Sequence, residues 1–304
     1  NPPMSRSYKA TGINLKGSPM GETDRLVTIL TIEQGLVRVI VPGARKHKSR
    51  LAGRSSQFVV NELFIVQGKS LDKLVQAETV RSFPGLSTAL SRLTASQYLA
   101  ELVLCQALSG QPQGTLFALL EEPLQLLEQE DSDDILACMS QGNLQLLRAA
   151  GVAPELHQCC LSQVAIAADL THSDWRIGFS AVAGGVVRVE QMSQIRSPHF
   201  RARSSVGRYA VRAGAQGDNR SGRSQQAPTT NLITAQELVW LQQLGSSELI
   251  TQQFLPGATT QPQQLLSWQR IERLLRQYAE FHFDRSIRSA TLIDACFPTP
   301  VSSR

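Results

Sequence analysis

The chain has 304 residues and a formal net charge of +5, with a pI of about 9.1; 42% of its residues are hydrophobic and 18% are charged. This length and this apolar fraction fit about two domains with packed cores. No apolar stretch reaches the ~20 residues that span a bilayer, and the first residues do not resemble a signal peptide, so we expect a cytoplasmic protein without a membrane partner.

Residues 7–81 contain five short segments with the composition of β-strands, rich in β-branched residues. We predict strands at 7–16, 25–32, 36–41, 58–66 and 74–80. Gly35 turns the chain between the second and third strands, which we expect to form a hairpin. Because closure removes exposed strand edges, this series of short strands predicts a small barrel. An OB-like barrel is the leading interpretation, and the pattern alone leaves an SH3-like barrel open.

The pattern changes at Phe83-Pro84-Gly85, beyond which apolar residues recur at helical spacing. We predict helices at 86–108, 115–128, 134–150, 234–243 and 262–288. Pro123 is expected to kink or end the second of them. The chain is therefore predicted to be a multidomain α+β protein, with a barrel domain over residues 1–82 and a helical domain over residues 83–304.

Two segments inside the predicted helical domain lack a helical pattern. Residues 152–195 return to a weaker β-like pattern around 175–179 and 185–189. Residues 196–230 are rich in Arg, Ser, Gly and Gln and cannot bury enough apolar surface to offset the entropy of ordering. We expect this Arg-rich insertion to be disordered. A tether for nucleic acid and a tolerated surface insertion are equally open interpretations of its charge.

The predicted barrel carries a dense group of cations. Residues 43–54 contain five of them and no acid. Clustered cations, with glycines that allow the backbone to approach closely, suit a phosphate backbone. The predicted DNA-binding residues are Arg25, Arg38, Arg45, Lys46, Lys48, Arg50 and Arg54. The other interpretation is a solvated connection between two strands with incidental charge.

Phe58 and Phe64 are the aromatic residues of the predicted fourth strand. Exposed aromatic rings on such a barrel would provide surfaces on which bases stack. The spacing of these two residues predicts instead that they point toward the barrel interior, so core packing is the favoured role.

Nothing in the sequence predicts an enzyme. No glycine-rich loop ends in the Lys-Ser or Lys-Thr of a nucleotide-binding motif. The histidines are scattered, and none lies in a nucleophile or metal motif. We therefore expect a binding protein without a cofactor. The alternative class is an RNA-binding OB-fold protein, which would recognise the 2′-hydroxyl of its ligand.

Several segments, in this order along the chain, resemble the RecO family of bacterial recombination mediators. The matching segments are 21–28 for the family's barrel motif, 43–53 for its basic loop, 77–86 for its barrel-to-helix junction, and 274–282 with 285–289 for its last helix. The resemblance fails across the Arg-rich insertion. It implies an N-terminal OB-fold, a helical domain, and a zinc-binding module inserted into the helices.

The resemblance also implies a function in DNA repair. RecO proteins bind single- and double-stranded DNA and anneal complementary strands. With RecR they help to load RecA onto DNA coated by single-strand binding protein. The expected partners are therefore both forms of DNA, RecR, the C-terminal tail of single-strand binding protein and, indirectly, RecA. A nucleoid-associated location in the cytoplasm follows, without enzymatic turnover.

The sequence departs from the family at the metal. Many members carry Cys-x-x-Cys twice, which gives tetrahedral thiolate ligation. Here Cys159 fits the first position, while Ser162, Arg188 and Gln191 stand at the other three. The candidates for a substitute site are His157, Cys159, Cys160 and His172. Since a structural zinc site needs four well-placed ligands, we expect residues 152–195 to be a degenerate, metal-free remnant of the module.

Overall fold

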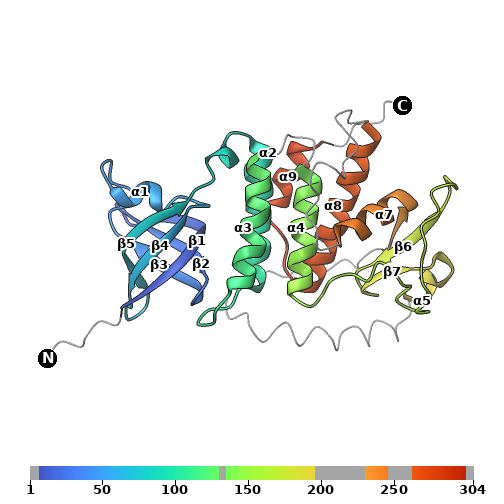
Figure 1. The fold of residues 1–304 in the computed structure, drawn as a ribbon, viewed down its shortest axis with the longest axis horizontal. Helices are drawn as coiled ribbons and strands as arrows, with labels where there is room; N and C mark the ends of the chain where they lie inside the picture. Colours follow the sequence, from blue (N-terminus) through green and yellow to red (C-terminus); the bar gives the residue numbers. More distant parts are fainter. Residues whose placement is uncertain (1–6, 130–134, 196–229, 246–261, 299–304) are drawn as a thin grey trace. The chain divides into compact units, whose positions relative to one another are not determined.

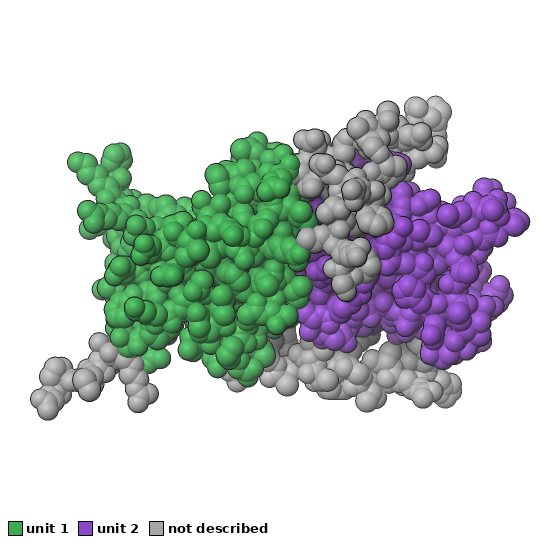
Figure 2. Space-filling view, in the orientation of Figure 1, with its two compact units in different colours: residues 1–129 green, residues 130–304 purple. Residues whose placement is uncertain are grey.

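The structure is a computed structural model that describes residues 7–129, 135–195, 230–245 and 262–298. It divides into two compact units, unit 1 over Asn1–Gln129 and unit 2 over Glu130–Arg304 (Figure 2). The first two long helices after the barrel, Leu90–Gln106 and Gly114–Gln129, thus belong to unit 1, and the predicted boundary at residue 82 stays a prediction. All of the predicted Arg-rich insertion except Thr230 lies outside the described residues.

Unit 1 begins with a closed five-stranded barrel (Figure 1). Its strands are β1 (Ser7–Met20), β2 (Asp24–Thr31), β3 (Gly35–Val41), β4 (Val60–Val66) and β5 (Asp72–Arg81). They follow the order β1-β2-β3-β5-β4, and β1 closes the barrel by pairing antiparallel with β4. β3 and β5 pair in parallel. This is the topology of an OB-like barrel, so the predicted fold of the N-terminal part is confirmed.

Alternate residues of the strands fill the barrel, as the two-residue period of a strand requires. The core includes Val27 and Ile29 of β2 with Leu63 and Ile65 of β4, each at most 2% exposed. Phe64 lies between the last two and therefore faces outward, where it is half-buried. Its predicted place in the core is wrong.

Phe58 has the predicted role, since its side chain is buried. It precedes β4 and has a φ of 60°, a value that few residues other than glycine adopt. The side chain of Phe58 is therefore not available as a stacking surface for bases.

The barrel continues into a short 3₁₀ helix, η1 (Pro84–Ser87), and two helices, α2 (Leu90–Gln106) and α3 (Gly114–Gln129). Pro123 lies inside α3 and does not end it. The turn between β2 and β3 is hydrogen-bonded to the connection between α2 and α3. Gly110 N–H donates to Gln34 O at 2.9 Å and Leu36 N–H donates to Leu108 O at 2.8 Å.

Gly35 sits where this turn meets the α2–α3 connection. Its φ is +65°, and a Cβ at this position would lie 2.1 Å from Leu108 O. Only glycine combines this backbone conformation with so close an approach. Gly35 is the turn residue predicted from the sequence, while its close approach to Leu108 O depends on the tertiary fold.

Unit 2 combines helices with a small three-stranded sheet of order β7-β6-β8 (Figure 1). Its elements are α4 (Ile135–Ala149), β6 (Arg176–Ser180), β7 (Gly185–Val187), η2 (Val189–Gln191), α5 (Met192–Ile195), β8 (Asn231–Thr234), α7 (Ala235–Leu244), α8 (Pro262–Phe283) and α9 (Ala290–Cys296). The helix predicted over 262–288 ends earlier than expected, and Asp284 just beyond it has a φ of 52°. Within the described ranges, no helix has both the length and the hydropathy to cross a membrane.

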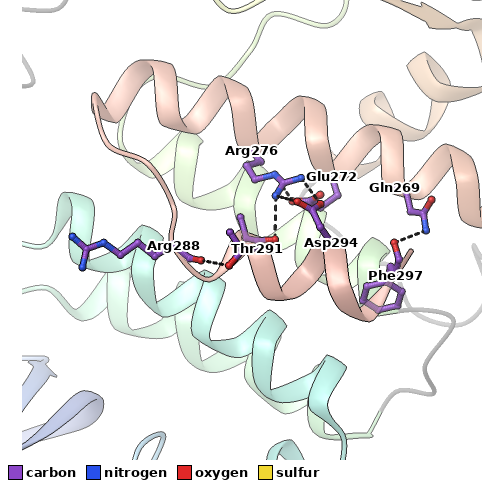
Figure 3. A network of polar contacts seen from close by, with 8 residues as sticks. Gln269, Glu272, Arg276, Arg288, Thr291, Asp294 and Phe297 are labelled. Carbon is purple, nitrogen blue, oxygen red and sulfur yellow. Dashed lines mark hydrogen bonds and ion pairs between the residues drawn. The ribbon is translucent and has the colours of Figure 1, made fainter. Parts of the chain in front are cut away.

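A polar cluster joins α9 to α8 inside unit 2 (Figure 3). Arg276 is only 8% exposed, and its guanidinium donates two hydrogen bonds to the Asp294 carboxylate at 2.8 and 3.1 Å. The same group lies 3.3 Å from Glu272, one turn away on α8. A third hydrogen bond runs from Arg276 to the Ala290 carbonyl. Arg276 therefore ties the start of α9 to the middle of α8.

Candidate nucleic-acid interface

The basic segment between β3 and β4 is folded against the barrel. Residues 50–54 form the short helix α1 (Arg50–Arg54), whose N-cap Ser49 accepts a hydrogen bond from Leu51 N–H. Ala44 belongs to the barrel core, and Leu51 packs against the same cluster. Helix α1 was not predicted, because its five residues are too few to show an apolar repeat.

The start of this segment is attached to the β1–β2 turn. The Asp24 carboxylate accepts hydrogen bonds from Gly43 N–H at 2.8 Å and from the Thr23 hydroxyl at 2.9 Å. Both hydrogen bonds lower the pKa of Asp24 below its usual value, and the bond from Gly43 has the larger effect. Arg45 donates from its guanidinium to Gly21 O at 2.9 Å and from its backbone to Thr23 O. Arg45 thus has a structural partner.

The end of the segment is attached by two buried amides inside the barrel wall. Asn14 and Asn61 both donate to the Arg54 carbonyl, at 2.8 and 2.9 Å, and Asn14 also donates to Ser56 O at 2.8 Å. The Arg54 guanidinium donates to the carbonyl of Ala77 on β5. The helix therefore has a fixed position on the barrel, and Arg54 helps to fix it.

Arg25 shares the two-residue period of the core residues Val27 and Ile29 along β2 and so faces the same side of the strand, but it lies at the end of the barrel. Its guanidinium donates to the Ser55 carbonyl at 3.2 Å and to the Ser55 hydroxyl at 3.1 Å. Its side chain crosses Gly17, where a Cβ would lie 3.2 Å from Arg25 Cδ. Arg25, like Arg45 and Arg54, is therefore engaged with the protein itself.

The other four predicted residues differ from these three. Arg38, Lys46, Lys48 and Arg50 are exposed, and within the described part of the chain no hydrogen bond or ion pair occupies their charged ends. Arg38 lies on the outer face of β3 and the other three lie in the folded basic segment. A DNA-binding role for the seven residues stays a prediction, but the structure separates anchored cations from exposed ones.

Strand register adds two cations that the sequence analysis did not select. Lys16 pairs with Thr28, and Thr28 pairs with Arg38, so these three side chains form a row across the outer faces of β1, β2 and β3. Lys73 of β5 pairs with Ile40, two residues beyond Arg38 on the same face. Lys46 and Lys73 both act on the pKa of Asp24, which places them near one end of the barrel.

We group six of the exposed cations of the barrel and its folded segment under the name basic surface. They are Lys16, Arg38, Lys46, Lys48, Arg50 and Lys73. Cations held on a rigid barrel attract a polyanion without rearranging, which suits binding to a phosphate backbone. Alternation of side chains along the strands could have placed Lys16 and Lys73 on the outer face of the barrel. Which cations lie beside them depends on the register between strands.

Comparisons with known proteins agree with this architecture. The family model described as recombination protein O N terminal matches residues 4–83, and the one described as recombination protein O C terminal matches residues 87–193. A protein of Gloeothece citriformis named DNA repair protein RecO is 48% identical over 303 residues, covering 97% of this chain and 99% of the relative. The chain belongs to the RecO family.

RecO proteins of other cyanobacteria match equally broadly. The DNA repair protein RecO of Acaryochloris marina is 47% identical over 298 residues, covering 98% of this chain and 97% of the relative. That of Synechococcus elongatus is 41% identical over 291 residues, covering 96% of each. The predicted family is confirmed, with a barrel followed by a helical region. An RNA-binding OB-fold protein is not favoured, because these relatives are named as DNA repair proteins.

The zinc ion that the RecO resemblance implies does not fit the residues present. Of the four expected positions only Cys159 supplies a thiol, and Arg188 contributes a cation. The described residues bring no group of three His, Cys, Asp or Glu side chains together in a way that holds a metal. The substitute site from His157, Cys159, Cys160 and His172 is therefore not formed. His172 instead pairs with Asp169 at 2.7 Å on the surface.

Proposed function

We propose that this RecO-family protein binds single- and double-stranded DNA through the basic surface and acts as a recombination mediator in DNA repair. The observation that carries the proposal is the set of exposed cations whose charged ends make no hydrogen bond or ion pair within the described residues. Three of them lie on barrel strands, and three lie in the segment that Asn14 and Asn61 anchor. Neutralising phosphates releases counterions, which drives binding at low salt.

Strand annealing follows from the same electrostatics. Two complementary strands repel each other through their phosphates, and a surface that neutralises one strand lowers this repulsion. Base pairing then supplies the favourable free energy, so the protein needs neither a nucleotide nor a covalent step. We accordingly propose a binding protein, not an enzyme, with no cofactor.

The wider role is proposed from family membership. With RecR, the protein would help to load RecA onto DNA coated by single-strand binding protein. The helical elements after the barrel would offer the surface for RecR and for the C-terminal tail of single-strand binding protein. Association with the nucleoid would follow from DNA binding.

The proposal is tested by removing exposed cations while leaving the anchored ones in place. The variant Lys46→Ala, Lys48→Ala, Arg50→Ala loses three charges but keeps the hydrogen bonds that hold the segment. Each phosphate contact contributes about 0.7 to the salt slope of single-strand binding, so the slope of log Kd against log salt should fall by about 2. Annealing of complementary oligonucleotides should slow in parallel.

The matched control removes three exposed arginines of unit 2, Arg188, Arg273 and Arg285, by substitution with alanine. It changes the net charge equally but leaves the basic surface intact, so its salt slope should stay at the parent value. Equal slopes for the parent and the first variant would reject the basic surface as the DNA-binding site. A loss of slope in the control alone would move the site to unit 2.

A further inference from the structure

Residues 159–162 and 188–191 have the spacing of two Cys-x-x-Cys pairs, although only Cys159 is a cysteine at the four end positions. The first pair sits on a tight turn. Cys159 N–H donates to Val164 O at 2.9 Å, and Gln163 N–H donates back to Cys159 O at 2.8 Å. The second pair begins directly after β7 and spans η2.

The side chain of Cys159 is fully buried and lies between the two pairs. Its thiol donates to Gln191 Oε1 at 3.0 Å, and its sulfur accepts a hydrogen bond from Arg188 N–H at 3.4 Å. Burial raises the pKa of the Cys159 thiol, but the neighbouring groups of Ser162, Arg188 and Leu161 together bring it below its usual value, which places Ser162 beside the sulfur. Of the three positions that lack a cysteine, Gln191 and Arg188 therefore hydrogen-bond to the thiol, through a side-chain amide and a backbone N–H, and Ser162 lies next to it.

Backbone hydrogen bonds also hold this part of the chain, among them Val186 N–H to Glu155 O and Glu155 N–H to Gly184 O, both at 2.9 Å. Cys160 N–H donates to Val186 O at 2.9 Å, linking the turn to β7. The local core has three buried residues, Cys159, Val187 and Ile195, with five partly buried neighbours. A core of this size stabilises little, and comparably small modules usually depend on a metal or a disulfide.

We propose that the Cys159 thiol is a hydrogen-bonded clasp that joins the turn at 158–166 to residues 186–191, at the place where four thiolates would hold a metal, and that this part of the protein folds without one. In the clasp the Cys159 thiol is a hydrogen-bond donor to Gln191 Oε1, and its sulfur is an acceptor for Arg188 N–H. The amide of Gln191 and the N–H of Arg188 then satisfy the buried sulfur on both sides.

The clasp is tested in the full-length protein by amide hydrogen exchange with peptide resolution. Gln191→Leu removes the acceptor and leaves the buried thiol without its partner, so exchange in peptides covering 158–166 should accelerate about tenfold. Gln191→Glu keeps an acceptor oxygen and should retain most of the protection. Gln194→Leu makes the same change at an exposed neighbour and should leave exchange unaltered.

Metal independence is measured on protein produced with added zinc. We expect no zinc retained in a one-to-one ratio and no effect of a chelator on exchange in these peptides. One zinc per chain, whose removal accelerates exchange at 158–166, would overturn the proposal. Unchanged exchange in Gln191→Leu would overturn it as well.

A reciprocal variant tests the placement of the four positions. Ser162→Cys, Arg188→Cys and Gln191→Cys together restore both pairs around Cys159. Zinc–sulfur bonds of about 2.3 Å put the sulfurs of a tetrahedral site about 3.8 Å apart, close to the contacts that now surround the Cys159 sulfur. This variant should bind one Co²⁺ with the visible absorption of a tetrahedral thiolate site, and the parent should not. If the variant binds no Co²⁺, the four positions do not converge as the clasp requires.

Discussion

Glu272 makes the stability of unit 2 depend on pH. Its side chain is buried on α8, 3.3 Å from the guanidinium of Arg276 (Figure 3). Burial raises the pKa of Glu272 to about 7, and the opposing effect of Arg276 does not compensate. Glu272→Gln keeps the shape of the side chain and removes the charge.

The direction of the effect follows from proton binding. Below about pH 4.5, the ordinary value for this carboxyl, Glu272 is protonated in both the folded and the unfolded state. As the pH rises toward 7, the unfolded chain ionises it freely while the folded protein resists, so stability falls. The change from 4.5 to about 7 corresponds to about 3 kcal/mol. Because Gln does not titrate, the variant should gain this amount relative to the parent between these pH values.

Tryptophan fluorescence during urea unfolding is a suitable assay. All three tryptophans, Trp175, Trp240 and Trp268, lie in unit 2, so the signal reports on the unit that contains Glu272. Asp174→Asn, a change at an exposed carboxyl, serves as the control and should reproduce the parent profile. Parallel pH profiles for the parent and Glu272→Gln would refute the reasoning, since burial of the carboxyl would then have no energetic consequence.

Three further changes have expected results. Asn14→Ala leaves the Ser56 carbonyl without its side-chain donor and the Arg54 carbonyl with Asn61 as its side-chain donor, and should cost about 1–3 kcal/mol in thermal unfolding followed by circular dichroism. Gly185→Ala would place a Cβ 2.2 Å from the Glu155 carbonyl at a φ of +151°, so the urea midpoint of tryptophan fluorescence should drop by the equivalent of more than about 2 kcal/mol. Lys16→Ala with Arg38→Ala should lower the salt slope of single-strand binding by about 1.4, without changing the urea midpoint.

Local patterns predicted most of the elements. The β-branched runs located all five barrel strands, and the turn glycine at Gly35 separated β2 from β3 as expected. The apolar repeats located α2, α3, α4, α7 and α8. β8 was missed because four residues before a helix show no period, and it becomes a strand only by pairing with β6. α9 was missed because the apolar pattern of α8 gives no sign of the break at Asp284.

The candidate interface was harder to predict, because it depends on contacts between distant parts of the chain. Composition identified the cations of residues 43–54. It did not distinguish Arg25, which is bonded to Ser55 thirty residues later, from Lys48, which has an exposed charged end. Lys16 and Arg38 share a row only through their common neighbour Thr28. Register of this kind is set by the closure of the whole barrel and is not visible in any short window.

The contact between the β2–β3 turn and the α2–α3 connection determines where this protein can be truncated without loss of stability. In a fragment that stopped after the last barrel strand, the Gln34 carbonyl would lose the Gly110 N–H as its donor, and the Leu36 N–H would lose the Leu108 carbonyl as its acceptor. It would also lack the Leu108 and Gln111 carbonyls against which Gly35 packs. The smallest stable fragment that contains the barrel should therefore extend to residue 129 and include both α2 and α3.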